Sequence, residues 1–211
     1  MIKVIFFDFD GVILDSMPIR DYGFRKIFEN YPNELVDKLI SYHQSNGGLS
    51  RFHKIRYFYN ELLKKDISEE RIEEYANKFS EIMKEQLTNK KYLISQTVNF
   101  IQKNYKNYNL HIVSGSEQNE LRYLCEKLDV SKYFITIEGS PTPKNDLVKN
   151  RLKNESYNSN EAILIGDSIN DYEAANINGL KFFGFNNIEL KEKDEYIDSF
   201  EKFDIKDFSC K

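Results

Sequence analysis

The 211-residue sequence contains only two cysteines, Cys125 and Cys210, and they lack the spacing of a metal-binding motif. This argues against a disulfide framework and is typical of proteins from a reducing compartment. No apolar run approaches the roughly 18 residues that a membrane span needs. The apolar stretch Val4–Phe7 is also too short for the core of a secretory signal peptide. We therefore expect a cytoplasmic protein with no membrane partner.

A basic tail or arm is missing as well. The chain has 30 lysines and arginines against 34 acids, a net charge of −4, and the two signs are interleaved. This pattern disfavours DNA or RNA as a partner. We find no internal repeat and no low-complexity linker. The length suits one domain with a large insertion or two small domains, and the sequence gives no indication of oligomeric state.

Short apolar segments bounded by polar turns recur along the chain, and such segments are typical of strands buried on both faces. Their alternation with helical patterns predicts an α/β fold, a Rossmann-like parallel sheet with helices on both faces. The predicted strands are Lys3–Phe7, Leu110–Val113, Phe134–Ile137, Ala162–Ile165, Lys181–Phe185 and an edge strand, Tyr196–Phe200. The predicted helices between them are Ser95–Tyr105, Glu117–Leu128, Pro143–Leu152 and Ile169–Ile177.

Residues 16–90 contain no strand pattern. Amphipathic helical stretches fill this part of the chain, separated by short polar or glycine-containing turns. They lie near Pro18–Asn30, Glu34–His43, Arg51–Lys64 and Glu69–Leu87. We therefore expect an all-helical cap domain, residues 16–90, inserted after the first strand of a catalytic core made of residues 1–15 and 91–211.

Polar residues directly follow the predicted core strands. In an open parallel sheet, ligands bind outside the carboxyl ends of the strands. That edge is expected to hold four acids, a hydroxyl and a lysine: Asp8, Asp10, Asp167, Asp171, Ser114 and Lys144. Each residue alone is most simply a helix cap, a turn former or a solvated side chain. Independent caps have no reason to occur in this order and spacing, so we interpret the six residues as one site.

The motifs resemble those of the haloacid dehalogenase-like hydrolase superfamily, in the group with a helical cap after the first motif. DFDGVILDS (8–16) resembles the first motif, Ser114 in IVSGS the second, Lys144 in GSPTPK the third and GDSIND (166–171) the fourth. The resemblance covers essentially the whole chain. It implies a nucleophile, a general acid/base, a phosphate-binding set and Mg²⁺ ligands. The resemblance makes Asp8 the nucleophile and Asp10 the general acid/base. It implies phosphate binding by Ser114, Gly115 and Lys144. It implies Mg²⁺ binding by Asp8, Asp10, Asp167 and Asp171, with Asp10 ligating through its backbone carbonyl.

The residue types suit phosphoryl transfer. The Asp8 carboxylate can attack phosphorus and form an aspartyl-phosphate, which splits one difficult displacement into two easier ones. Asp8 and Asp167 offer the hard oxygen ligands that Mg²⁺ prefers. The Ser114 hydroxyl and the Lys144 ammonium can hold the transferring phosphoryl oxygens. Asp171 is expected to orient Lys144 or a metal-bound water.

Asp10 decides between the chemistries found in the superfamily. Its carboxyl can protonate the leaving oxygen and then take a proton from the attacking water. Members that cleave carbon–halogen bonds resemble this chain but lack the second acid, since a halide leaves without a proton. The presence of Asp10 therefore favours phosphate esters as substrates.

The predicted cap carries a basic cluster in NGGLSRFHKIR, residues 46–56. The simpler interpretation places Arg51 and Lys54 on a solvated helix face. Alternatively, the loop at Gly47 and Gly48 reaches the core, and Arg51 meets an anionic or polyhydroxyl part of the substrate. Gly48 to Arg51 is similar to the Gly-x-Ser-Arg of capped sugar-phosphate mutases, whose arginine binds a second phosphate. Those mutases, however, have a histidine at the position matched by Arg20.

The leading prediction is therefore a Mg²⁺-dependent phosphatase that hydrolyses a small phosphorylated metabolite, with a phosphosugar as the first candidate. A phosphosugar mutase of the β-phosphoglucomutase type is the alternative. A non-catalytic protein that binds a phosphometabolite is a second alternative, but it predicts a degraded acid set, whereas every member is present. The histidines His43, His53 and His111 have no evident catalytic setting.

Overall fold

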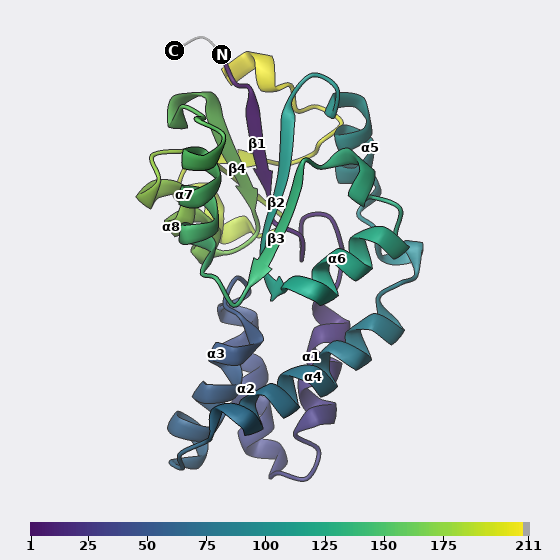
Figure 1. Ribbon diagram of the computed structural model, residues 1–211, viewed down its shortest axis with the longest axis vertical. Helices are drawn as coiled ribbons and strands as arrows, with labels where there is room; N and C mark the ends of the chain where they lie inside the picture. The colour runs from purple at the N-terminus through teal and green to yellow at the C-terminus, as the bar shows by residue number, and fades with distance from the viewer. Residues whose placement is uncertain (209–211) are drawn as a thin grey trace.

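Six parallel strands form the central sheet of the structure, a computed structural model that describes residues 1–208 (Figure 1). The strands are β1 (Val4–Phe7), β2 (Asn109–Glu117), β3 (Thr136–Ser140), β4 (Ala162–Gly166), β5 (Lys181–Phe185) and β6 (Glu195–Ile197). Their order is β3-β2-β1-β4-β5-β6, so the chain switches direction across the sheet between β1 and β4. The predicted Rossmann-like fold is confirmed.

Helices cover both faces of the sheet. Helices α5 (Ser95–Asn104) and α6 (Gln118–Lys127) lie on one face, and α7 (Lys144–Asn154) and α8 (Ile169–Ile177) lie on the other (Figure 1). Side chains of β1 alternate between two apolar clusters, because successive strand residues point to opposite faces. Burying each large apolar side chain of β1 contributes about 1.5–3 kcal/mol.

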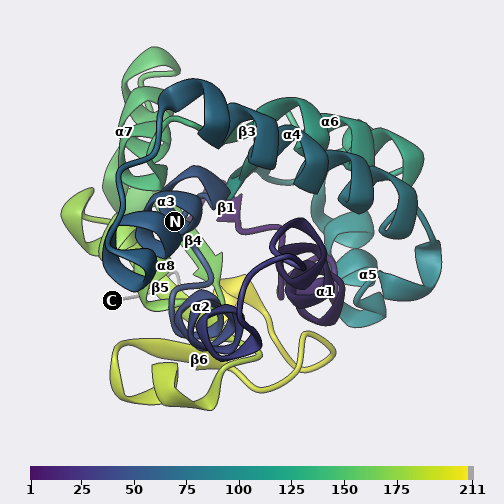
Figure 2. The ribbon, with the colours of Figure 1, turned by 90° about the horizontal axis from the view of Figure 1, so that it is seen from below.

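Four α-helices lie beyond the carboxyl ends of the strands: α1 (Met17–Ile27), α2 (Asn33–Ser45), α3 (Arg51–Tyr57) and α4 (Glu69–Gln86) (Figure 1). Seen from that end, they stand in front of the sheet (Figure 2). Their apolar faces pack on one another and belong to the same large cluster as one face of the sheet. The division of the chain into a core and a cap at these boundaries stays a prediction.

Several predicted boundaries shift. The strand predicted at Phe134–Ile137 is β3, which begins at Thr136 because a 3₁₀ turn occupies Ser131–Tyr133. The predicted edge strand shortens to β6, the last strand of the sheet. The single helix predicted at Arg51–Lys64 is α3 followed by a π-helical segment, Phe58–Leu63, which ends where Lys64 adopts a φ of +53°.

Three further findings bear on the sequence predictions. Cys125 is a buried free cysteine, while Cys210 lies outside the described residues. Within residues 1–208, no helix is both long and apolar enough to span a membrane. His111 is fully buried in β2, between Thr136 and Tyr157, so it belongs to the core.

Candidate active site

Two aspartates stand at the carboxyl ends of neighbouring strands. β1 and β4 pair with Phe7 opposite Ile165, and the Asp8 amide donates a 2.9 Å hydrogen bond to the Ile165 carbonyl. The two strands therefore lead side by side into Asp8 and Asp167. Carboxylate oxygens of Asp8, Asp167 and Asp171 lie within 4.8 Å of one another. The order of strands in the sheet thus builds an acidic cluster from opposite ends of the chain.

Lys144 joins this cluster from the first turn of α7. Its Nζ lies 2.9 Å from Asp8 Oδ1 and forms a second ion pair with Asp171 Oδ1. The other Asp171 oxygen accepts hydrogen bonds from the Ser168 amide (3.0 Å) and hydroxyl (2.6 Å), which cap the start of α8. Asp171 is fully buried, so its contacts fix the position of the Lys144 ammonium against Asp8.

Negative charge exceeds positive charge in the cluster. Burial and the nearby Asp171 raise the pKa of Asp8 from 3.8 to about 7, although Lys144 acts against this shift. Burial and Asp8 raise the pKa of Asp167 well above its usual value. Among the described residues, the buried Asp8 Oδ1 has Lys144 Nζ, at 2.9 Å, as its cationic partner. A divalent cation such as Mg²⁺ prefers hard, negatively charged oxygen ligands, and the carboxylates of this cluster supply them. The residues present therefore fit a Mg²⁺ site.

The raised pKa of Asp8 makes stability depend on pH. The Asp8 carboxyl stays protonated in the folded protein up to about pH 7, whereas it ionises near 3.8 in the unfolded chain. This contribution to stability is complete below pH 3.8 and is lost as pH rises through 7. Without divalent metal, Asp8→Asn should therefore become progressively more stable than the wild type between pH 4 and 7.

The difference in the free energy of unfolding between Asp8→Asn and the wild type should grow by up to about 1.4 kcal/mol per pH unit. Urea unfolding of both proteins in EDTA at several pH values measures it. Titration of the histidines changes the stability of both proteins in the same way. Its contribution therefore cancels when the stability of one protein is subtracted from that of the other. A constant difference across this range would contradict the raised pKa.

Gly11 leaves the room that Asp167 occupies. A Cβ built on Gly11 would lie 1.8 Å from Asp167 Oδ2, and the φ of Gly11 is +75°. Gly11→Ala should displace the Asp167 carboxylate and weaken Mg²⁺ binding by about tenfold or more. Gly179→Ala is the matched control, because Gly179 has a φ of +70° but its nearest neighbour lies at 3.6 Å. The Mg²⁺ affinity of each variant can be measured from the rise in its thermal midpoint as Mg²⁺ is added. Equal Mg²⁺ affinities of the two variants would contradict the prediction.

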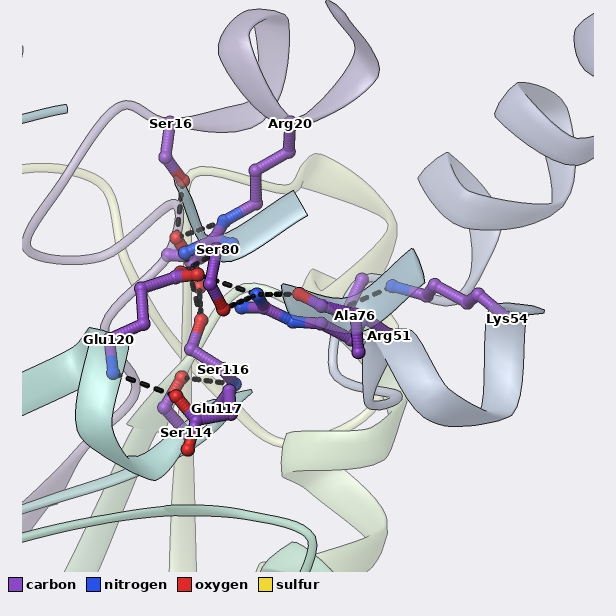
Figure 3. A network of polar contacts seen from close by, with 12 residues as sticks. Ser16, Arg20, Arg51, Lys54, Ala76, Ser80, Ser114, Ser116, Glu117 and Glu120 are labelled. Carbon is purple, nitrogen blue, oxygen red and sulfur yellow. Dashed lines mark hydrogen bonds and ion pairs between the residues drawn. The ribbon is translucent and has the colours of Figure 1, made fainter. Parts of the chain in front are cut away.

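The Asp10 carboxylate is the acceptor in a hydrogen-bonded network whose donors, Ser16, Arg20 and Ser116, are labelled in Figure 3. Its Oδ1 accepts hydrogen bonds from the Ser16 hydroxyl and from Arg20 Nε (2.6 Å), and its Oδ2 accepts one from the Ser116 hydroxyl (2.6 Å). Burial alone would raise the pKa of Asp10, but Arg20 and the two hydroxyls hold it below its usual value. The Asp10 side chain is thus an ionised carboxylate bound from two sides, by Ser16 and Arg20 of the helical segment (residues 16–90) and by Ser116 of β2. Its predicted ligation of a metal through the backbone carbonyl stays a prediction.

The loop at Gly47 and Gly48 closes on the end of β2. A Cβ on Gly115 would lie 2.4 Å from the Gly48 carbonyl oxygen, so the two backbones meet there. The buried Ser114 hydroxyl accepts a hydrogen bond from the Ser116 amide. One small cavity is lined by most of the predicted site residues, together with Met17 and Gly47; those predicted residues are Asp8, Asp10, Arg20, Gly48, Ser114, Gly115 and Asp167. Lys144, Asp171, Arg51 and Lys54 do not line it.

The expectation of a solvated basic face on α3 is wrong. Arg51 and Lys54 are 4% and 2% exposed. Arg51 forms a 2.6 Å ion pair with Glu120 and a 2.6 Å hydrogen bond to Ser80, while Lys54 Nζ lies 2.8 Å from His43 Nδ1. The reason is that α3 packs on α4 and on the end of β2. The Arg51 and Lys54 side chains therefore lie in the interior, whereas Arg56 of the same helix is partly exposed.

Sequence reasoning missed Ser116 and Glu120. Ser116 stands two residues beyond Ser114 on the same strand. Because side chains two residues apart on a strand point to the same face, this spacing could have indicated that Ser116 lies near the site. Glu120, on α6, is fully buried and bonds Arg20 and Arg51 from the helical segment. An acid on an amphipathic surface helix is ordinarily solvated, and nothing in the local sequence marks this one as buried.

The sequence of the chain matches a known protein family. The sequence profile described as haloacid dehalogenase-like hydrolase matches residues 5–185. No curated protein matches the sequence significantly.

Solved structures are similar in fold along the whole chain. β-Phosphoglucomutase from Clostridium difficile has a TM-score of 0.78 at 19% identity, covering 99% of this chain and 96% of that one. A mutant of CbbY from Rhodobacter sphaeroides, in complex with xylulose-1,5-bisphosphate, has a TM-score of 0.77 at 18% identity, with 96% of each chain covered. A predicted phosphoglycolate phosphatase from Haemophilus somnus has a TM-score of 0.71 at 16% identity, covering 94% and 95%.

Proposed function

The chain belongs to the haloacid dehalogenase-like hydrolase family, and from this premise we propose that it is a Mg²⁺-dependent phosphatase of a small phosphorylated metabolite, with a phosphosugar as the first candidate. One observation carries the proposal. Asp8, Asp167 and Asp171 bring carboxylate oxygens within 4.8 Å of one another, and Lys144 Nζ lies 2.9 Å from Asp8. A nucleophile, a divalent-cation site and a phosphate-binding ammonium then coincide at the sheet edge where ligands bind.

Asp8 and Asp167, with the backbone carbonyl of Asp10, are the residues that would hold Mg²⁺. When bound, the cation would neutralise the repulsion between the Asp8 carboxylate and the substrate phosphate and keep Asp8 ionised at neutral pH. The Ser114 hydroxyl, the Gly115 amide and the Lys144 ammonium would bind the remaining phosphoryl oxygens.

The reaction then proceeds in two displacements. An Asp8 carboxylate oxygen attacks phosphorus while the bond from phosphorus to the leaving oxygen breaks, and Asp10 gives that oxygen its proton. Water next attacks the aspartyl-phosphate, the Asp10 carboxylate takes a proton from it, and phosphate leaves with Asp8 regenerated. The lowered pKa of Asp10 favours the ionised form, which is the one required for the second step. The charge of an incoming phosphate would raise its pKa toward the protonated form required for the first.

Release of inorganic phosphate from a panel of phosphorylated metabolites tests this function. We expect Mg²⁺-dependent release from a few small compounds, and a phosphosugar among them. Release from none of a broad panel, by a folded protein with Mg²⁺ present, would contradict the proposal.

A phosphosugar mutase is the second candidate, favoured by the similarity in fold to β-phosphoglucomutase. It predicts conversion of one sugar-phosphate isomer into another when a bisphosphate primer is present, with little free phosphate released. Measuring both products in one reaction separates the candidates. A non-catalytic phosphometabolite-binding protein would give neither product.

A further inference from the structure

A second small cavity lies beside Asp10, between the helical segment and the core. It has a volume of about 20 Å³, and three basic side chains line it: Arg20, Arg51 and Lys54. Asp10 belongs to both cavities, so this space adjoins the position of the group that leaves phosphorus. Its volume suffices for about one water-sized group, so the side chains around it would meet a single polar group, such as a hydroxyl, of the leaving group.

Carboxylates already neutralise the two guanidinium groups of this cavity (Figure 3). Arg20 Nε pairs with Asp10 at 2.6 Å. Glu120 lies behind both arginines, with Oε2 at 2.6 Å from Arg51 Nη1 and Oε1 at 3.3 Å from Arg20 Nη1. Glu120 is completely buried and is not among the residues that line the cavity. Two guanidinium charges thus face two carboxylate charges.

The donors that remain free suit an uncharged oxygen. Within residues 1–208, Arg51 Nη2 is buried and has no hydrogen-bond acceptor. In the same described part of the chain, Lys54 Nζ bonds two neutral acceptors, His43 Nδ1 at 2.8 Å and the Gly47 carbonyl at 3.2 Å. Burial and the nearby Arg20 lower the pKa of Lys54 to about 7, so its positive charge is partial at neutral pH. The cavity therefore offers N–H donors with little net positive charge.

We propose that Glu120 is a specificity-determining residue, which neutralises Arg51 and Arg20 so that the site takes an uncharged, hydroxyl-bearing leaving group and rejects one that carries a second phosphate. The proposal rests on the proposed phosphatase function and names its substrate class, a monophosphate. A second phosphate would have to displace Glu120 from Arg51 and leave the buried Glu120 carboxylate with only its longer, 3.3 Å contact to Arg20. Glu120 acts through the arginines, without touching the substrate.

The test compares each sugar monophosphate with the bisphosphate of the same sugar, for example glucose 6-phosphate or glucose 1-phosphate with glucose 1,6-bisphosphate. For the wild type we expect kcat/KM to favour the monophosphate by about tenfold or more. Glu120→Gln leaves Arg51 without its carboxylate, so this preference should fall by about tenfold or more. The double variant Glu120→Gln, Arg51→Gln restores the charge balance, and its preference should return to within about threefold of the wild type.

Glu126→Gln is the matched control, because Glu126 is an exposed acid on the same helix. Its preference should equal that of the wild type. A wild type that hydrolyses both substrates equally well, or a folded Glu120→Gln protein with unchanged preference, would overturn the proposal. The wild-type comparison can overturn the proposal even when Glu120→Gln does not fold.

Calorimetric titration with inorganic phosphate, in the presence of Mg²⁺, tests the cavity without turnover. Glu120→Gln should bind one phosphate more than the wild type, and Glu126→Gln the same number. Unchanged stoichiometry in Glu120→Gln would overturn the charge argument. Failure of the wild type to hydrolyse any phosphate ester would instead count against the phosphatase function, while the stoichiometry still reports on Glu120.

Discussion

Replacing Asp8 by asparagine should lower kcat by about 10⁴-fold or more, because an amide cannot form the aspartyl-phosphate. Asn has the shape of Asp, and it removes a buried carboxylate whose pKa is raised to about 7 by burial and by Asp171. The folded structure should therefore persist, with a thermal midpoint no lower than that of the wild type at pH 7 without metal. Steady-state phosphate release with Mg²⁺, together with circular dichroism, measures both effects.

Asp15→Asn is the control for this experiment. Asp15 lies in the same motif but is exposed. Its replacement should leave kcat within about twofold of the wild type, in line with the small effects of surface substitutions. Activity of Asp8→Asn within tenfold of the wild type would show that another group is the nucleophile.

Removing divalent metal should abolish activity, with a loss of about 10³-fold or more in EDTA that added Mg²⁺ reverses. The physical reason is the charge of the site. Asp8, Asp167 and Asp171 face a single ammonium, that of Lys144, and a phosphate adds further negative charge. Mg²⁺ should also raise the thermal midpoint, because it binds the folded cluster alone.

Asp167→Asn should abolish this stabilisation by Mg²⁺, because it removes a carboxylate charge from the cluster. Glu155→Gln is a suitable control, since Glu155 is an exposed acid at the far end of α7. Full activity in EDTA, or equal stabilisation of the wild type and Asp167→Asn by Mg²⁺, would contradict a cation held by Asp8 and Asp167.

The sequence was sufficient to predict the parallel sheet and the edge at which its polar residues collect. Short apolar strands followed by Asp8, Ser114 and Asp167 carry that information locally, and the carboxyl ends of neighbouring parallel strands must meet. The strand order could not be read in the same way. It places β1 beside β4 and thereby brings Asp8 to Asp167.

The polar interior between the helices and the core was not predictable. Helical periodicity distinguishes apolar from polar faces, and on that basis Arg51 and Lys54 belonged outside. Their burial depends on partners far away in the sequence, such as Glu120, and ion pairs between distant elements leave no periodic signal. The same limit applies to Asp10, whose place in the motif was evident but whose pairing with Arg20 was not.

A crystal structure of the protein with Mg²⁺ and beryllium trifluoride, a mimic of the phosphoryl group, would show which side chain receives the phosphoryl group. We expect beryllium bonded to a carboxylate oxygen of Asp8, with Mg²⁺ in contact with both Asp8 and Asp167. An adduct on another residue, or Mg²⁺ bound without contact to these two aspartates, would contradict this expectation.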